Sequence, residues 1–279
     1  MMYVGVTTFK NLLGMVTMVC GISAVWRLLE ANEDKLMWHR ARHLLAHALM
    51  IVTALWLLVK CDSKTSLSCF GLSSTVMFMS TRPWVKKKAR RIHLVVATAI
   101  GIPLFALFVD SMGTLLHLLG RQPNLTDRTS IWRAVLAMHT NPFVGTGFES
   151  FWLGSHLQSV WDLSVHGIQE AHNGYLEVYI NLGWIGELLL IALIITGYRN
   201  ILRALRSDPH LGRLRLAFFT AALIYCLTEA GFRMMNPIWV AFLLAITSTT
   251  AHMVVKLPRI IAPLPPARNA AEQRMRVLQ

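Results

Sequence analysis

Seven apolar segments dominate this sequence, and each is long enough to cross a lipid bilayer, for which a helix needs ~20 mostly apolar residues. They cover residues 11–28, 43–59, 65–81, 92–109, 176–198, 214–232 and 238–255. Hydrophobic residues make up 54% of the chain, and charged residues only 15%, against roughly 25% in ordinary soluble domains. We therefore predict an all-α polytopic membrane protein of about seven transmembrane helices. Disordered, coiled-coil and small disulfide-linked classes are excluded.

Lys and Arg residues are distributed unevenly among the loops and predict the orientation. The net charge is +13, which in a soluble protein would indicate nucleic acid binding. Here the basic residues fall between apolar segments, so we expect no nucleic acid partner and apply the positive-inside rule. Twenty of the 27 basic residues lie in four alternate regions, which are 27–42, 82–91, 199–215 and the tail from 256. These regions are predicted to be cytoplasmic, with the N-terminus outside and the C-terminus inside.

The predicted spans divide the chain into four parts. Residues 1–109 hold the first four transmembrane helices, and 110–175 form a large extracytoplasmic loop with short helices. Residues 176–257 hold the last three helices, and 258–279, rich in proline, are expected to be a disordered cytoplasmic tail. An odd number of spans with an outside start leads us to expect that the chain is the rear portion of a longer protein.

The outer loop is the predicted place for chemistry, because long loops in compact proteins are usually functional. Thr126 or Asp127 can cap a helix that continues to His139, and Asn141-Pro142 ends it. A tight turn follows at Gly145–Gly147. Four cysteines lie in or beside apolar segments without a CxxC pattern, so neither a disulfide framework nor a zinc site is expected.

His172 is the first candidate functional residue, since it lies where a polar loop meets an apolar segment. Its neighbours Glu170, Asn173 and Glu177 can orient the ring, and a neutral imidazole there can act as a general base. The alternative is an ordinary surface histidine. A metal pair with His166 lacks a third convincing ligand, so no metal is expected.

Cationic side chains on the same outer side form the second set of candidates. Arg128 falls in the first turn of the predicted loop helix, where it opposes the helix dipole and favours an anionic partner. Its alternative is a solvated helix residue, and that of Lys64 is interfacial snorkelling. Arg133 lies on the same outer side. Glu229 and Arg233 are four residues apart, which predicts an ion pair at the outer end of the sixth span.

Several motifs together resemble the O-antigen ligase and polysaccharide polymerase superfamily of membrane glycosyltransferases. They occupy residues 125–132 (LTDRTSIW), 141–148 (NPFVGTGF), 171–176 (AHNGYL) with 182–186 (LGWIG), 62–67 (DSKTSL) and 10–14 (KNLLG). Family members have about twelve spans with the large loop before the last three. The resemblance therefore implies a truncated GT-C-like bundle that lacks an N-terminal half. This chain has Lys64 where the family often has arginine, and Asp127 where a glycine is common.

The resemblance also implies a reaction and a location. The donor would be a polyprenyl-diphosphate-linked glycan, and the acceptor a sugar hydroxyl on lipid A core or on a growing glycan. The enzyme would be a metal-independent, inverting glycosyltransferase without a cofactor, in the bacterial inner membrane with its loop in the periplasm. The resemblance implies that His172 and Arg128 are catalytic. The diphosphate would be bound by Lys64, Arg128, Arg133 and Arg233. The residues that would orient His172 are Glu170, Asn173 and Glu177.

Three alternatives remain open at this stage. A polysaccharide polymerase differs from a ligase only in its acceptor. A membrane transporter could use Glu187, His47 and Glu229 as an ion path, although no internal repeat is visible. An inactive fragment that binds lipid or a partner is the third.

Overall fold

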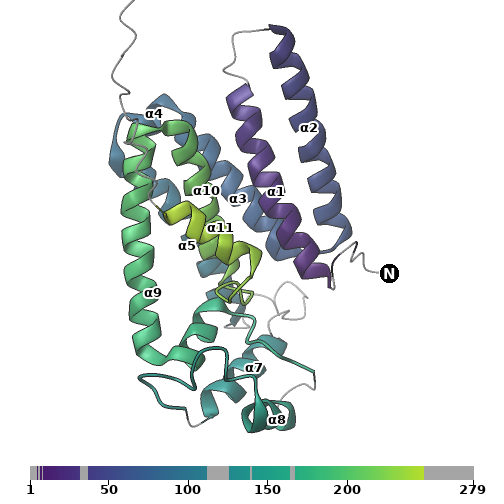
Figure 1. Cartoon of the computed structure of the whole chain (residues 1–279), viewed down its shortest axis with the longest axis vertical. Helices are drawn as coiled ribbons and strands as arrows, with labels where there is room; N and C mark the ends of the chain where they lie inside the picture. Colours follow the sequence, from purple (N-terminus) through teal and green to yellow (C-terminus); the bar gives the residue numbers. More distant parts are fainter. Residues whose placement is uncertain are drawn as a thin grey trace, which may run out of the picture. The chain divides into compact units, whose positions relative to one another are not determined.

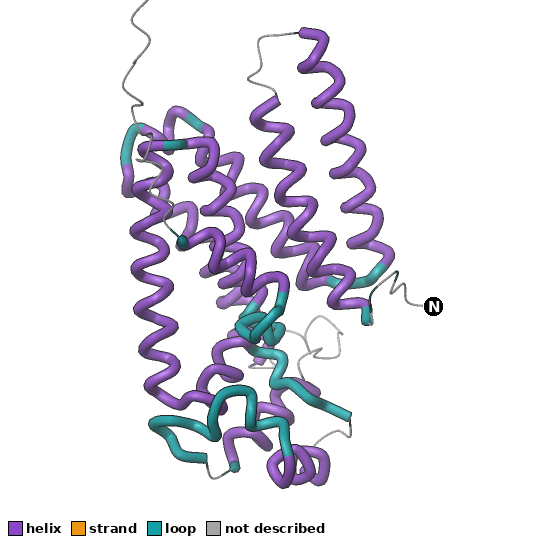
Figure 2. Tube along the Cα trace, viewed as in Figure 1, coloured by secondary structure: helices purple, strands orange, loops and turns teal. Residues whose placement is uncertain are grey.

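The computed structural model consists of α-helices joined by turns and loops wherever it describes the chain, at residues 5, 7, 9–31, 37–111, 126–138, 140–163 and 167–247 (Figure 2). Within these ranges the extended pairing is a single bridge between Asn141 and Gly145. The helices are α1 (Lys10–Ala31), α2 (Met37–Lys60), α3 (Lys64–Thr81), α4 (Pro83–Lys86), α5 (Ala89–Ser111), α7 (Thr126–Ala137), α8 (Gly154–Leu163), α9 (Gly174–Ser207), α10 (Pro209–Tyr225) and α11 (Pro237–Ile246).

Four helical stretches in the described residues are long and apolar enough to cross a membrane. They are Lys10–Ala31, Arg40–Lys60, Arg90–Leu107 and Gly174–Ser207. The other three predicted segments are helical in α3, α10 and α11 but do not reach the same length and hydropathy. α11 has 10 residues, which gives ~15 Å against a hydrocarbon core of ~30 Å. The membrane class is supported, and the count of seven spans stays a prediction. The rest of the seventh segment and the tail 258–279 lie outside the described residues.

α10 ends earlier than the sequence pattern predicts. It begins where the Asp208 side chain accepts the first free amides of the helix, and it ends at Tyr225. Residues 226–236 form turns instead of helix. The apolar run continues through them because Ala230 and Phe232 are buried, and burial alone does not require a helix. The predicted helix through residue 232 is therefore wrong.

α9 is interrupted at Gly183, which has φ 61° and ψ −159°. The interruption frees backbone amides and carbonyls of α9. Four backbone hydrogen bonds with the turn at residues 142–147 pair these groups, two donated by α9 and two by the turn. The chain approaches so closely that a Cβ on Gly183 would lie 2.3 Å from the Phe143 carbonyl carbon. The predicted continuous span is thus a short half-helix followed by a longer helix.

α10 lies at the centre of the helical bundle and packs against α1, α3, α5, α9 and α11 (Figure 1). A second, smaller core holds the outer loop together against the half-helix of α9. Its buried members are Ile131, Val135, Phe151, Trp152, Val160, Ala171 and Ile180. The loop is therefore a folded unit with its own apolar interior, which gives the residues on it defined positions.

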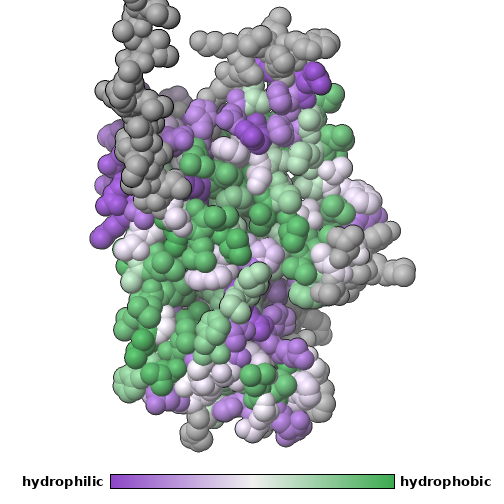
Figure 3. All heavy atoms as spheres, in the orientation of Figure 1, coloured by the Kyte–Doolittle hydropathy of each residue, from purple (hydrophilic) through white to green (hydrophobic). Residues whose placement is uncertain are grey.

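The two ends of the bundle differ in their residues. At one end Thr65 Oγ1, on the first turn of α3, lies 3.1 Å from Thr228 Oγ1. α3 then runs ~27 Å to α4 and the basic segment 82–91 at the other end. Hydrophobic residues cover the middle of the molecule in Figure 3, with hydrophilic residues towards both ends. The segment around Glu229 and the basic segment are thus separated by the length of α3.

Candidate active site

The backbone beside His172 is held by three side chains, one from α7, one from α9 and one from the residue that caps α9. Ala171 donates its amide to Glu177 Oε1 at 2.5 Å and accepts a hydrogen bond from Trp132 Nε1 at 2.8 Å. The Asn173 side chain caps α9 by accepting two amides of its first turn. His172 itself has a φ of +49°, which is uncommon for a residue with a side chain and often marks a functional position. Glu177 and Asn173 thus orient the backbone beside His172, and the described contacts connect neither of them to its ring.

The imidazole of His172 lies between two carboxylates. Its Nδ1 is 2.9 Å from Glu170 Oε1 and 3.4 Å from Glu229 Oε2. These hydrogen bonds, that of Glu170 first, outweigh partial burial and raise the pKa of His172 to about 9. The resting ring is therefore an imidazolium at neutral pH, and the neutral form is the minor one. Within the described residues, Nε2 has no protein hydrogen-bond partner.

Glu229 connects three distant parts of the chain. It is buried, and it accepts hydrogen bonds from Arg128 Nη2 at 3.1 Å and from Asn11 Nδ2 at 3.3 Å in addition to its contact with His172. Arg128 and His172 contact the same carboxylate, so their side chains are separated by roughly 9 Å at most. The first turns of α1 and α7 and the loop before α9 therefore meet at one buried acidic group.

Arg233 pairs with carboxylates other than the one that sequence spacing predicts. Its Nη2 is 3.1 Å from Glu149 Oε2, and its Nη1 is 3.7 Å from Glu170 Oε2. The predicted pair with Glu229 is wrong, because α10 has already ended and the two residues do not share a helical face. One continuous series of ionic contacts, called the cluster below, instead runs through Arg128, Glu229, His172, Glu170 and Arg233.

Two of the predicted cations lie outside this series. Lys64 is exposed at the first position of α3, next to the Thr65–Thr228 contact. Arg133 is exposed on α7, five residues beyond Arg128 and therefore on a different face of the helix. Neither forms an ion pair within the described residues. The fold thus brings Arg128 and Arg233 to carboxylates that contact His172, and it leaves Lys64 and Arg133 outside this series.

Sequence reasoning missed three members of the site in these roles. By spacing alone, Glu229 pairs with Arg233, and nothing distinguishes Glu149. For Glu229 a signal exists, because an acidic side chain at the end of an apolar segment is by default a candidate functional residue. Asn11 belongs to the motif at 10–14, but its partner, like that of Glu149, is remote in sequence and leaves no local signal.

A cation would have to compete with arginines for this site. The ligand atoms of Glu170, His172 and Glu229 all lie within 4.8 Å of one another, which is a spacing that a metal ion can use. Two of the three groups are already neutralised, Glu229 by Arg128 and Glu170 by Arg233. A metal ion at this position would therefore have to displace Arg128 and Arg233 from these carboxylates.

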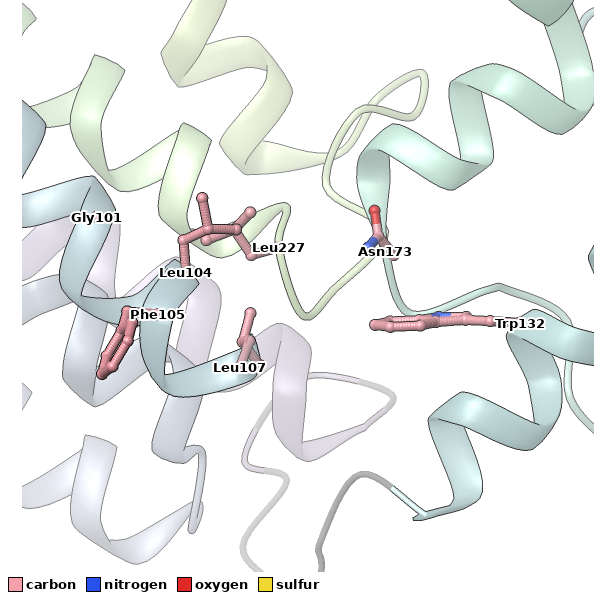
Figure 4. A pocket seen from close by; sticks show the side chains of 7 residues that line it. All are labelled: Gly101, Leu104, Phe105, Leu107, Trp132, Asn173 and Leu227. Carbon is pink, nitrogen blue, oxygen red and sulfur yellow. The ribbon is translucent and has the colours of Figure 1, made fainter. Parts of the chain in front are cut away.

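An apolar groove of about 630 Å³ lies next to the cluster (Figure 4). Leu104, Phe105 and Leu107 of α5 line one side of it, and Trp132 of α7 lies opposite with Asn173. The groove thus reaches the residue that follows His172. Its remaining lining residues are Gly101 and Leu227.

Comparison with known proteins identifies the family. A family model described as O-antigen ligase matches residues 48–191, slightly more than half of the chain, and includes Arg128 and His172. The exopolysaccharide production protein ExoQ of Rhizobium meliloti (strain 1021) is 22% identical over 255 residues. That alignment covers 88% of this chain and 58% of the relative, so the chain spans little more than half of the relative's length. The matched region holds the helices and loop that position the histidine and its arginine, and the chain belongs to the O-antigen ligase family.

Proposed function

We propose that this chain transfers a glycan from a polyprenyl diphosphate to a hydroxyl group of a second sugar, in the biosynthesis of lipopolysaccharide or exopolysaccharide. One observation carries the proposal, namely that Arg128 and His172 contact the same buried carboxylate of Glu229. A cation for the leaving group and a base for the acceptor are thereby close enough to act on one bond. Family membership and the name of the relative support the same reaction class.

The two arginines are assigned to the diphosphate. A guanidinium binds phosphate oxygens in a bidentate manner, and Arg128 and Arg233 lie on either side of His172 through their carboxylate partners. Before the donor binds, the guanidinium of Arg128 is paired with Glu229 and that of Arg233 with Glu170. The incoming diphosphate replaces the carboxylates and gains two fixed cations that stabilise its charge as it leaves. Lys64 and Arg133 are assigned a weaker, longer-range role.

His172 is assigned to the acceptor. Neutral Nε2 takes the proton of the acceptor hydroxyl while Nδ1 keeps its hydrogen bonds to Glu170 and Glu229, which stabilise the imidazolium that forms. The acceptor oxygen bonds to the anomeric carbon as the bond from that carbon to the diphosphate breaks. The diphosphate leaves as an anion and needs no proton. One such displacement inverts the anomeric centre, and no metal is required.

The groove beside the site is assigned to the apolar part of the donor. Its α5 side is lined by Leu104, Phe105 and Leu107, and the opposite wall holds the Trp132 ring (Figure 4). Trp132 also donates to Ala171, the residue before His172. A polyprenyl chain lying in the groove therefore brings the diphosphate to the arginines.

The acceptor is either a lipid A core sugar, as for a ligase, or the end of a growing glycan, as for a polymerase. We place the site on the periplasmic side of a bacterial inner membrane. This placement is supported by the position of the basic segment 82–91 at the far end of α3, where the positive-inside rule requires the cytoplasm. Among the residues of the transporter alternative, only Glu229 belongs to the cluster.

The experiment is a transfer assay in membrane vesicles that contain the full chain and a radiolabelled polyprenyl-diphosphate glycan. Arg128→Ala is expected to reduce transfer by about 100-fold or more, the usual loss for one group that stabilises transition-state charge. Arg133→Ala, on the same helix but outside the cluster, is the matched control and is expected to change transfer only a few-fold.

Three results would contradict the proposal. His172→Ala with full activity would remove the base, and equal losses in the two arginine variants would remove the specific role of Arg128. Absence of transfer by the unmodified chain with both classes of acceptor would overturn the reaction itself.

A further inference from the structure

We propose that the outer loop of this protein inserts into the outer leaflet of the membrane through an apolar edge formed by Phe143, Val144, Trp184 and Ile185. The edge joins the turn after Asn141 to the first turn of α9 beyond its break. This inference goes beyond glycosyl transfer and does not depend on it. Its ligand is the lipid surface itself.

The edge is rigid because backbone hydrogen bonds connect its two halves. Trp184 donates its amide to Pro142 O at 2.9 Å, and Ile185 donates to Phe143 O at 3.1 Å. On the other side of the break, Thr146 and Gly147 donate to the last carbonyls of the half-helix. The turn therefore moves with α9 and cannot withdraw from it without losing these bonds.

All four side chains of the edge are exposed although they are large and apolar. Phe143 is 65% exposed, Val144 52%, Trp184 54% and Ile185 50%. Contiguous exposed apolar residues of this kind mark an interaction surface. A turn that only needed to reach across solvent would carry polar residues here.

The edge continues the lipid-facing side of α9. Leu188 and Leu189 are also exposed, and positions 184, 185, 188 and 189 follow the spacing of one helical face. Figure 3 shows hydrophobic residues along α9 down to its lower end, where the loop begins. Because the lipid-facing side and the edge form one surface, lipid is the occupant that this continuity favours over a soluble partner.

The apolar part of α9 beyond its break is shorter than the hydrocarbon core. From Trp184 to Tyr198, before the basic residues begin, the straight helix covers ~21 Å, whereas the hydrocarbon core is ~30 Å thick. The half-helix before Gly183 turns away and buries Glu177, Ile180 and Asn181. Phe143 is bonded through its carbonyl to the Ile185 amide, so the edge extends the apolar surface of the straight helix. Trp184 suits the interface, at which tryptophan is enriched.

The test measures the depth of a fluorescent probe in proteoliposomes. Phe143→Cys, in a Cys20→Ser background because Cys20 is the exposed natural cysteine, is labelled with an environment-sensitive dye. Quenching is then compared between a nitroxide lipid labelled near the headgroup and aqueous iodide. Leu188→Cys serves as the lipid-exposed reference and Ser155→Cys on α8 as the aqueous reference. Val144→Cys is a second probe should the first variant not fold.

We expect the probe at position 143 or 144 to lose most of its fluorescence to the nitroxide lipid and little to iodide, as at position 188. Quenching that matches position 155 would overturn the proposal, because the edge would then lie in water. Protection from both quenchers would also overturn it, since a second copy or another part of a protein would cover the edge.

Discussion

His172 combines an unusual backbone conformation with an unusual electrostatic setting. Its φ of +49° directs the ring away from the path of a regular helix start and towards Glu170 and Glu229. Such a conformation persists only where the surroundings enforce it, and here both peptide groups of Ala171 are bound by side chains. The two carboxylates in turn hold the ring as an imidazolium.

The raised pKa of His172 predicts the pH dependence of transfer. If neutral Nε2 is the base, kcat/KM rises up to about tenfold per pH unit from pH 6 and levels off near pH 9. Glu229→Gln removes one of the carboxylates that raise this pKa, so the plateau should begin at lower pH. The measurement is transfer rate against pH in vesicles.

The control for this profile is Glu30→Gln, which changes a carboxylate paired with Arg27 and distant from the site. Its profile should coincide with that of the unmodified chain. A rate that falls above pH 9 would show that the imidazolium, rather than the neutral ring, supports the reaction.

The interruption of α9 is the decisive feature at the scale of secondary structure. An unbroken helix would continue its hydrogen-bond ladder through residue 183 and leave no free groups for the turn at 142–147. With the break, that turn satisfies backbone groups on both sides of Gly183. The loop and the half-helix that carries Asn173 and Glu177 are thus assembled as one piece.

Gly183→Ala is expected to destabilise this assembly. The residue has a positive φ, and its Cβ would lie 2.3 Å from the Phe143 carbonyl carbon, so the expected cost is about 1–3 kcal/mol or more. Thermal unfolding in detergent measures it. Gly71→Ala in α3 is the control, because nothing lies within 4 Å of the added Cβ and a helical alanine is favoured by up to ~1 kcal/mol. Equal changes in Tm for the two variants would contradict the role of the break.

At the scale of the described helical bundle, the site and the basic segment lie at opposite ends. α3 starts beside the segment that holds Glu229 and ends at α4, where the residues of 82–91 begin. The positive-inside rule predicts that this basic end is cytoplasmic, and on that prediction the loop that holds His172 faces the other compartment. The compartment that the site faces therefore depends on the orientation of the chain in the membrane.

Cysteine labelling of intact cells determines the orientation of the chain in the membrane. With Cys20→Ser as background, Ser155→Cys on α8 is expected to react with a membrane-impermeant maleimide, and Lys88→Cys beyond α4 only after the cells are permeabilised. Both positions are exposed in the structure, so a difference reports sidedness rather than burial. Reaction at Lys88→Cys alone in intact cells would reverse the orientation and place the site in the cytoplasm.

Much of the fold class and part of the site are predictable from local sequence. Apolar length predicts membrane helices because it depends only on consecutive residues, and motifs such as 141–148 and 171–176 point to the family for the same reason. A helix in the loop is also present close to where the sequence predicts it, at Thr126–Ala137, and Thr126 is its first residue. The partners of the charged residues are not predictable in this way, since Glu229 binds residues more than 50 positions away.

The sequence by itself determined the helical membrane class, the family and the presence of a histidine and an arginine in one long loop. Only the tertiary structure decided that α10 ends at Tyr225, that α9 breaks at Gly183 and that Glu229 joins Arg128 to His172. Spacing rules assume that a helix continues. Packing and backbone hydrogen bonds between distant segments determine where it stops, and these contacts leave no mark in any single stretch of the chain.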